Sequence, residues 1–217
     1  MVMLAVMALM ACRDANKKGI IPETANTNMQ TPLESTLQQT NFDTIIDGNA
    51  VKLFLLENKD LKMAITNYGG RIVALWAPDQ DGEFIDVSIG YPSIKDYVES
   101  AESYFGATIG RVGNRIAKGK FSLDGAEYSV VPNNNENALH GGEHGFQDKV
   151  WDAEQPDQKS LILRYTSPDM EEGFPGNLMV KVIYSLTDSM AVKMEYEATT
   201  DKTTVVNLTN HTYFNLN

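Results

Sequence analysis

The sequence has few of the residues that form disulfides and metal sites. Its 217 residues include one cysteine, Cys12, and three histidines. A single cysteine excludes an intramolecular disulfide and a cysteine-rich zinc site. The spacing of His140, His144 and His211 does not fit a helical metal motif. We therefore expect no metal site of these two kinds.

Positive charge is also scarce. The chain has 18 Lys and Arg residues against 29 Asp and Glu residues, which gives a formal net charge of −11. Nucleic-acid binding depends on basic side chains that neutralise phosphates, so this balance argues against a nucleic-acid partner. Surface acids mainly keep a protein soluble, so the charge identifies no other partner.

A long apolar run occurs at the amino terminus. Met1–Ala11 is entirely apolar, with the length of a signal-peptide core, and is too short to span a bilayer as a helix. The run ends in Leu9-Met10-Ala11-Cys12, which resembles a bacterial lipobox. We expect a signal peptide over residues 1–12 and lipidation at Cys12. No Lys or Arg precedes Cys12, so an ordinary secretory signal and a cytosolic chain remain alternatives.

This interpretation predicts an exported lipoprotein of the cell envelope, in the bacterial periplasm or outer membrane. The membrane contact would be only the lipid anchor at Cys12. Residues 13–41 are rich in Asn, Thr, Gln and Pro, with few large apolar side chains. Such a stretch cannot bury enough surface to offset its ordering entropy, so we expect a flexible linker there. Residues 42–217 are expected to form one domain.

Beyond Phe42 the apolar residues recur with a period of two, which is typical of half-buried antiparallel strands. The pattern covers Leu61–Ile65, Leu178–Leu186 and Met190–Ala198. Ser93–Glu99 is the one segment that reads as a short helix. The sequence therefore predicts an all-β fold built as an antiparallel sandwich.

Turn residues predict two hairpins. Asp124-Gly125 can supply the positive φ angles of a type I′ turn, which would close a hairpin over Lys120–Val130. Phe121 would then face Tyr128 across the pair. Asp81-Gly82 is expected to close a second hairpin.

Three polar segments carry the candidate site residues. They are GRVGNRIA at residues 110–117, NALHGG at residues 137–142 and NLTNHTYFNLN at residues 207–217. Side chains of Asn, Thr, His and Tyr crowd into the last of these. This composition suits a site that hydrogen-bonds a polyhydroxylated ligand and moves a proton.

Together these segments resemble the aldose 1-epimerase (galactose mutarotase) family. The resemblance is carried by YFGATIGRVGNRIAKGKF at residues 104–121, NALHGG at 137–142 with GFQDKVW at 145–151, and NHTYFNL at 210–216. It runs from about residue 40 to the last residue, in the family's order. It implies a large galactose mutarotase-like β-supersandwich, incomplete at the C-terminus. Family members are longer and carry an essential Glu in their C-terminal part, so we expect a C-terminally truncated member.

The resemblance also implies roles for individual residues. His211 would be the acid that protonates the sugar ring oxygen, which suits a group with an unperturbed pKa of about 6.5. His140 would hydrogen-bond the sugar and is the second candidate for the proton transfer. Asn114, Arg115 and Tyr213 would bind hydroxyls, with the planar Arg115 guanidinium offering several donors. Tyr213 would lie beside His211, because residues two apart in a strand face the same side.

The resemblance implies an isomerase of hexose metabolism that interconverts the α and β anomers of free galactose and glucose. This reaction requires neither a metal nor a cofactor, so we expect none. We expect the 217-residue chain itself to be a monomer and inactive. The alternative is a non-catalytic sugar-binding envelope lipoprotein. A phosphorylated hexose is a weaker option, because only Arg115 and Arg111 are available near the motifs for a phosphate.

Other polar and aromatic residues near these motifs have simpler interpretations. Trp76 and Trp151 could stack on a sugar, but tryptophan is more often a core residue. His144 is expected in a solvated loop. The asparagine cluster at residues 133–137 predicts a turn without a role in the site.

Overall fold

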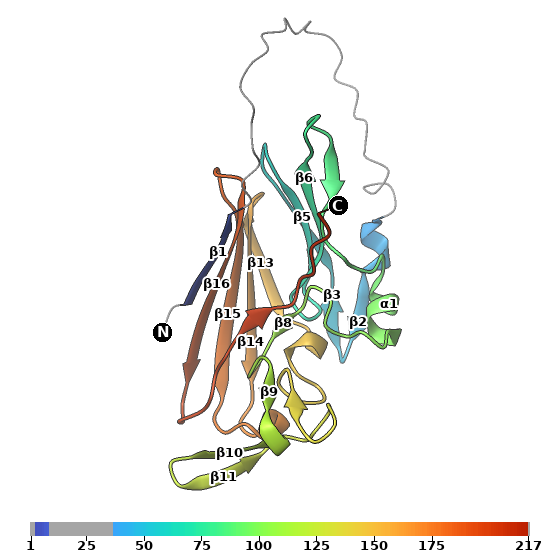
Figure 1. Ribbon diagram of the computed structural model, residues 1–217. Coiled ribbons are helices and arrows are strands. Elements are labelled where there is room, and N and C mark those ends of the chain that lie inside the picture. Colours follow the sequence, from blue (N-terminus) through green and yellow to red (C-terminus); the bar gives the residue numbers. More distant parts are fainter. Residues whose placement is uncertain (1–2, 9–36, 217) are drawn as a thin grey trace, which may run out of the picture.

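The computed structural model describes the backbone of residues 3–8 and the whole of residues 37–216. Two antiparallel sheets form the body of the molecule (Figure 1). The four-stranded sheet has the order β4-β5-β6-β7, with β4 at Leu53–Glu57, β5 at Lys62–Thr66, β6 at Arg71–Pro78 and β7 at Phe84–Asp86. The five-stranded sheet has the order β1-β16-β15-β14-β13, with β1 at Met3–Ala8, β13 at Asp152–Asp157, β14 at Ser160–Ser167, β15 at Leu178–Leu186 and β16 at Ala191–Thr200.

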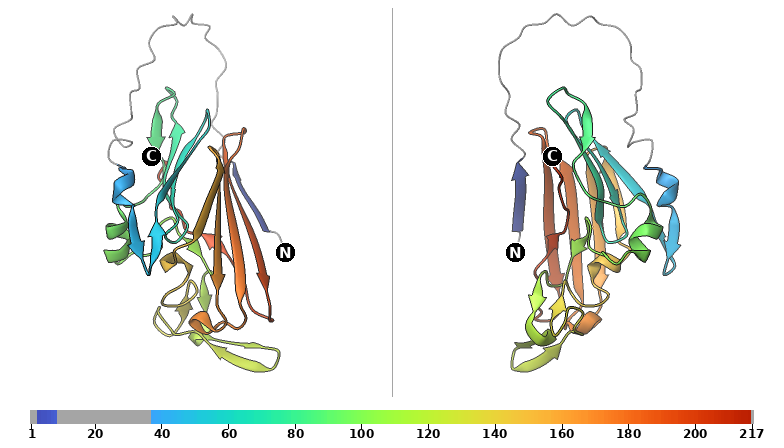
Figure 2. Two further views of the ribbon diagram at one scale, coloured as in Figure 1. Left: turned by 180° about the vertical axis from the view of Figure 1, so that it is seen from behind. Right: turned by 45° about the vertical axis from the view of Figure 1, so that its right-hand side comes forward.

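The two sheets face each other across the main core (Figure 2). Met63 and Ile65 of β5 contribute to the same buried cluster as Leu163 of β14 and Val182 of β15. Apolar side chains from two inner faces are what hold a sandwich together. The predicted all-β antiparallel sandwich is confirmed.

The alternation predicted for residues 178–186 is confirmed, because alternate side chains of β15 from Leu178 to Leu186 are buried. The half-buried pattern predicted for β5 is wrong. Ala64 lies in a second buried cluster on the other face of the sheet, with Val73 and Trp76. Since further elements cover that face, β5 is buried on both sides.

These covering elements are the hairpin of β2 (Thr44–Ile46) and β3 (Asn49–Val51) and helix α1 (Ile94–Glu99). Leu37 and Phe42, on either side of the short 3-10 helix η1 (Gln39–Asn41), also pack there. The predicted helix is confirmed, and it begins where Ser93 caps it by accepting a hydrogen bond from the Asp96 N–H at 3.2 Å.

Short elements fill the lower end of the molecule in Figure 1 and the connections beside it. They are β8 (Thr108–Ile109), β9 (Arg115–Ile116), η2 (Ala117–Gly119), β10 (Lys120–Leu123), β11 (Ala126–Ser129), β12 (Ala138–Leu139), η3 (Phe146–Asp148), η4 (Glu171–Gly173) and β17 (Thr209–Asn210). The predicted β10–β11 hairpin is confirmed. Asp124 and Gly125 have φ angles of 51° and 82°, and the Phe121 and Tyr128 rings stack at 5.4 Å.

The second predicted hairpin, β6–β7, is also confirmed, with a wider loop than a two-residue turn. Asp79 Oδ1 accepts hydrogen bonds from the backbone N–H groups of Asp81 and Glu83 at 2.8 and 3.0 Å. Gly82 adopts a φ of 87°. The Asp79 side chain therefore organises the loop around the glycine.

The amino-terminal prediction falls mostly outside the described residues. Cys12 and residues 13–36 of the expected linker are not described. Met3–Ala8 of the apolar run forms β1, which pairs antiparallel with the edge of β16. Leu37, which lies within the expected linker, packs against the second core. In the described part of the chain, no helix is long and apolar enough to cross a membrane.

Candidate functional site

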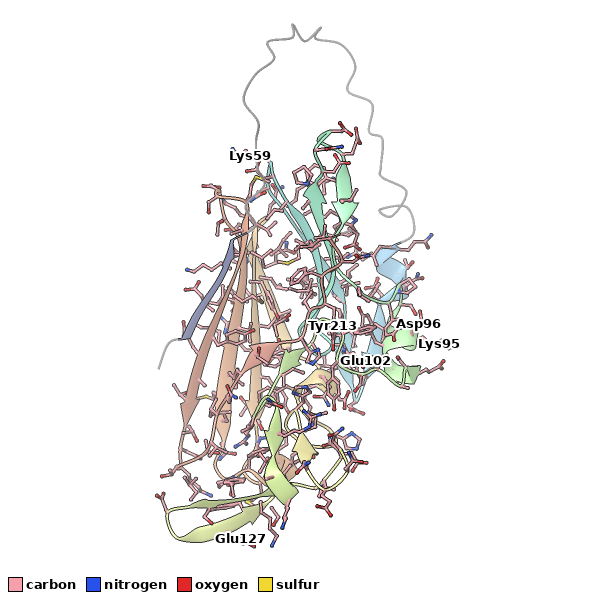
Figure 3. The ribbon with its side chains drawn as sticks, viewed as in Figure 1. Lys59, Lys95, Asp96, Glu102, Glu127 and Tyr213 are labelled. Atoms are coloured by element: carbon pink, nitrogen blue, oxygen red, sulfur yellow. The ribbon has the colours of Figure 1, made fainter. Side chains whose placement is uncertain are left out.

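Two short strand pairings bring the three polar segments together. β9 pairs with β12, so that Arg115 lies opposite Leu139, next to His140. β17 pairs with β8, so that Asn210 lies opposite Thr108 and His211 follows directly. Figure 3 places Tyr213 at mid-height of the molecule, well above Glu127 of the β10–β11 hairpin. Residues separated by about 100 positions therefore share one site.

His140 and His211 are in direct contact. Their ring centroids lie 4.9 Å apart, with an angle of 84° between the ring planes. Both residues are half-buried. The two histidines that the sequence identified as candidates for proton transfer thus form one edge-to-face pair.

His140 is held in an unusual backbone conformation. Its φ is 53°, and the next residue, Gly141, has a φ of 95°. A side chain at Gly141 would collide with the Gly110 carbonyl oxygen. Glycine is therefore required at this position for the loop to approach the segment at Gly110.

The protonation state of His140 follows from its contacts. Its Nδ1 accepts a hydrogen bond from the Asn114 backbone N–H at 3.1 Å, so the proton of the neutral ring lies on Nε2. Burial, followed by the positive charges of His211 and Arg115, lowers the pKa of His140 from 6.5 to about 4. At neutral pH His140 is a neutral ring that donates through Nε2.

The Arg115 side chain is exposed and oriented by two asparagines. Its Nε donates to Asn134 Oδ1 at 3.0 Å, and its Nη1 donates to Asn114 Oδ1 at 3.2 Å. Among the described residues, the remaining N–H groups of this guanidinium have no hydrogen-bond partner. They are donors available to a ligand.

The asparagine turn at residues 133–137 supports the site, a role that the sequence did not predict. The turn itself is confirmed, since Asn134 and Asn137 form a bridge and Asn135 has a φ of 54°. Asn133 Nδ2 donates to the carbonyl oxygens of Leu139 and Gly142 at 3.1 and 2.8 Å, and its Oδ1 accepts from the Leu139 N–H at 2.6 Å. Asn133 therefore holds the loop that carries His140, while Asn134 orients Arg115.

Tyr213 lies beside His211, as predicted, with ring centroids 5.2 Å apart. It is 45% exposed and packs edge-on against Phe105 at 5.4 Å. The strand that carries it is shorter than expected, because β17 ends at Asn210. The segment continues through backbone hydrogen bonds, from the His211 N–H to the Ala107 carbonyl at 2.9 Å and from the Ile89 N–H to the Tyr213 carbonyl at 3.0 Å.

Tyr104 is a second residue of the site that the sequence did not single out. Its ring centroid lies 4.8 Å from that of His140 and 5.7 Å from that of His211. It lies inside one of the motifs, but its contact with both histidines depends on the pairings of β8 and β17. No local pattern in the sequence reveals that contact.

Several other residues considered from the sequence do not join the candidate site. Trp76 and Trp151 are core residues, 3% and 1% exposed. Arg111 is 2% exposed and donates to Ser167 Oγ at 2.8 Å and to the Pro175 carbonyl at 3.0 Å, so its guanidinium is not available to a phosphate, which weakens the phosphorylated-hexose alternative further. His144 has a largely exposed side chain, as predicted, with Asp148 3.7 Å away. Among the described residues, no group of three His, Cys, Asp or Glu side chains could hold a metal ion.

Known sequences match most of this chain. The family profile described as Aldose 1-epimerase matches residues 52–217. Galactose mutarotase from Sus scrofa is 44% identical over 169 residues, which cover 78% of this chain and 48% of the relative. Aldose 1-epimerase from Escherichia coli strain K12 is 35% identical over 171 residues, with 78% and 49% covered. The chain spans about half the length of the curated relatives it matches.

Solved structures show the same relationship. A GalM/aldose epimerase homologue from C. elegans superposes with a TM-score of 0.73 at 31% identity, covering 77% of this chain and 51% of that one. A galactose 1-epimerase from Lactobacillus acidophilus has a TM-score of 0.70 at 29% identity, covering 80% and 51%. The three motifs meet at one site, and the family profile matches residues 52–217 of the chain. This chain belongs to the aldose 1-epimerase family.

Proposed function

We propose that this chain supplies the sugar-binding and proton-donating side of an aldose 1-epimerase site. The reaction interconverts the α and β anomers of free hexoses such as galactose and glucose. The observation that carries this proposal is the approach of His140 and His211 to 4.9 Å, from segments far apart in the sequence. Family membership supports the choice of sugar anomers as substrates.

Mutarotation needs an acid and a base. The acid protonates the ring oxygen as its bond to C1 breaks, while the base removes the proton from the C1 hydroxyl. The free aldehyde then rotates and the ring closes on its other face, with the two protons returned. We assign the acid to His211, whose ring contacts those of His140 and Tyr213.

His140 is better suited to binding than to the acid role. A histidine whose pKa is about 4 is almost entirely neutral at pH 7, so it has no imidazolium proton to transfer to the ring oxygen. Its neutral Nε2–H can donate a hydrogen bond to a sugar oxygen. The free N–H groups of Arg115 and the exposed Tyr213 hydroxyl add donors around the same sugar.

The reaction also requires a base beside the acid. Within the described residues, neither imidazole has a hydrogen bond or an ion pair with a carboxylate. The resemblance to the family assigns the base to a Glu in the C-terminal part of longer members. We therefore propose that residues 1–217 bind the sugar and do not by themselves accelerate mutarotation. The same observation favours the second candidate, a sugar-binding protein without catalysis.

Two measurements on the purified chain test this proposal. Isothermal titration calorimetry with D-galactose and D-glucose should show binding that weakens in Arg115→Ala. The matched control is Arg164→Ala, which removes an exposed arginine paired with Glu154 at 2.8 Å, away from the site. Loss of binding in both variants, or no binding in the unaltered chain, would contradict the sugar site.

Polarimetry on freshly dissolved α-D-galactose separates the two candidate functions. The proposal predicts that the chain binds sugar and that mutarotation in its presence proceeds at the spontaneous rate. Acceleration that disappears in His211→Asn would establish catalysis by this chain and would mean that one of its own residues serves as the base. Acceleration that survives in His211→Asn would remove the acid role from His211.

A further inference from the structure

We propose that Tyr104 is a positioning residue of this site, whose ring fixes the edge-to-face arrangement of His140 and His211. Its effect on sugar binding rests on the proposed function. Its effect on the two imidazoles does not, so the two can be tested separately.

The three rings contact one another. Tyr104 meets His140 at 4.8 Å with an interplanar angle of 69°, and it meets His211 at 5.7 Å with an angle of 35°. The histidines themselves meet at 4.9 Å and 84°. Aromatic rings prefer such edge-to-face and tilted contacts at centroid distances of about 4.5–7 Å. Removing the tyrosine ring therefore removes one contact from each histidine.

Tyr104 is anchored to the core through its backbone. The fully buried Arg71 donates from Nη1 to the carbonyl oxygens of Ser103 at 2.7 Å and Phe105 at 3.1 Å, on either side of Tyr104. The Tyr104 N–H also donates to Glu102 Oε1 at 3.1 Å. The histidines, by contrast, follow two-residue strands near the surface. Tyr104 therefore presents its ring to both histidines from a segment that is tied to the buried core.

The same segment also holds the backbone of His211. The Gly106 N–H donates to the His211 carbonyl at 3.2 Å, and the His211 N–H donates to the Ala107 carbonyl at 2.9 Å. The chain from Ser103 to Ala107 therefore connects the buried Arg71 to His211, and the Tyr104 ring extends that connection to His140.

The Tyr104 ring packs against the half-buried His140 ring and so covers part of its surface. The charged groups that act on His140 are His211 and Arg115, and both lower its pKa after burial itself. Burial raises the pKa of Tyr104, so its hydroxyl is neutral throughout the physiological range. Tyr104 therefore acts on His140 by shape and exclusion of water, not by charge.

The test uses Tyr104→Ala and Tyr104→Phe in the full chain, with the His140 imidazole titrated by ¹H–¹⁵N NMR in the absence of sugar. Tyr104→Ala exposes the imidazole to water, so its midpoint should rise from about 4 by roughly one unit or more toward 6.5. Tyr104→Phe keeps the ring and should keep the midpoint. The matched control is Tyr128→Ala, which removes a partly buried ring from the stacked pair with Phe121 and should leave His140 unchanged.

Sugar binding is the second readout. Tyr104→Ala should weaken galactose binding roughly 3- to 10-fold, whereas Tyr104→Phe should stay within about twofold of the unaltered chain. A midpoint that moves in a chain that binds no sugar would support the positioning role and refute the proposed function. A midpoint unchanged in Tyr104→Ala would overturn the positioning role, whatever the sugar does.

Folding of the variants is checked by thermal unfolding. If Tyr104→Ala does not fold, Tyr104→Leu replaces it, since leucine keeps apolar volume without a ring. An intermediate rise of the His140 midpoint in that variant supports the proposal. A His140 midpoint equal to that of Tyr104→Phe contradicts it, because the ring would then have no role of its own.

Discussion

Asn114 and His140 exchange two hydrogen bonds across the site. The Asn114 N–H donates to Nδ1 of His140 at 3.1 Å, and the His140 N–H donates to the Asn114 carbonyl at 3.0 Å. Both residues have positive φ angles, 63° and 53°. This pairing fixes the tautomer of His140 and joins the segment that carries Arg115 to the segment that carries His140.

The first prediction concerns pH. The pKa of His140 is about 4 in the folded chain and near 6.5 when unfolded, so the unfolded chain binds the proton more strongly. The contribution of this group to stability is complete above pH 6.5 and is lost as the pH falls from about 6.5 to about 4. Urea unfolding at a series of pH values should show this loss.

His140→Asn is the matching variant, because Asn tolerates a positive φ and does not titrate. It should flatten the pH dependence of the free energy of unfolding between pH 4 and pH 6.5. Parallel curves for the variant and the unaltered chain would show that His140 titrates normally.

The second prediction concerns Asn134. Asn134→Ala removes the acceptor of Arg115 Nε, so the guanidinium loses one of its two described partners. Galactose binding should weaken roughly 2- to 10-fold, as expected for one lost hydrogen bond. Asn49→Ala is the control, because it removes an exposed asparagine that bonds Asp47 outside the site. Equal effects of the two substitutions in calorimetry would argue against a role for Asn134 in orienting Arg115.

The third prediction concerns Asn133. Asn133→Ala removes three hydrogen bonds to the loop that carries His140. We expect a loss of about 1–3 kcal/mol in the free energy of unfolding, because the Leu139 and Gly142 backbone groups lose their partner. Chemical denaturation measures this. A change within about 0.5 kcal/mol would mean that water replaces these bonds without cost.

The fourth prediction compares two glycines with similar backbone angles. Gly141 and Gly125 have φ angles of 95° and 82°, but a Cβ on Gly125 meets nothing whereas one on Gly141 collides with the Gly110 carbonyl. Gly125→Ala should cost about 1–2 kcal/mol, from its φ alone. Gly141→Ala should cost more than about 3 kcal/mol and displace His140. Similar costs in thermal or urea unfolding would show that the Gly141 loop moves freely.

The fifth prediction concerns Cys12, which lies outside the described residues. The sequence predicts its lipidation, and several acyl chains are needed for stable anchoring. Cys12→Ser should shift the protein from the membrane fraction to a soluble fraction after cell fractionation. Unchanged membrane association of the variant would rule out the lipid anchor.

The sequence predicted the sandwich, the two hairpins and the short helix because each depends on local periodicity or turn chemistry. It failed for β5, since burial on both faces depends on the elements that pack beyond Ala64. The burial of Arg111 could not be predicted for the same reason. A lone arginine reads as a surface donor, and only the tertiary structure surrounds it with the oxygens of Ser167, Pro175 and Gly176.

In the candidate site, the motifs identified His140, His211, Arg115, Asn114 and Tyr213, and the structure brings these residues together. The sequence did not identify the residues that orient these five side chains. Tyr104 acts through ring contacts with two distant segments, and Asn133 acts through backbone groups of a neighbouring turn. Such roles depend on strand pairing, which no local pattern encodes.

The imidazole ¹H–¹⁵N spectrum of the chain during titration with D-galactose tests whether the sugar binds at the two histidines. The sugar site predicts that the His140 and His211 signals move together with a single midpoint. His144, whose side chain is largely exposed four residues after His140, should not move. If calorimetry shows binding while His140 and His211 stay unchanged, or if His144 alone responds, the sugar binds elsewhere and the assigned site is wrong.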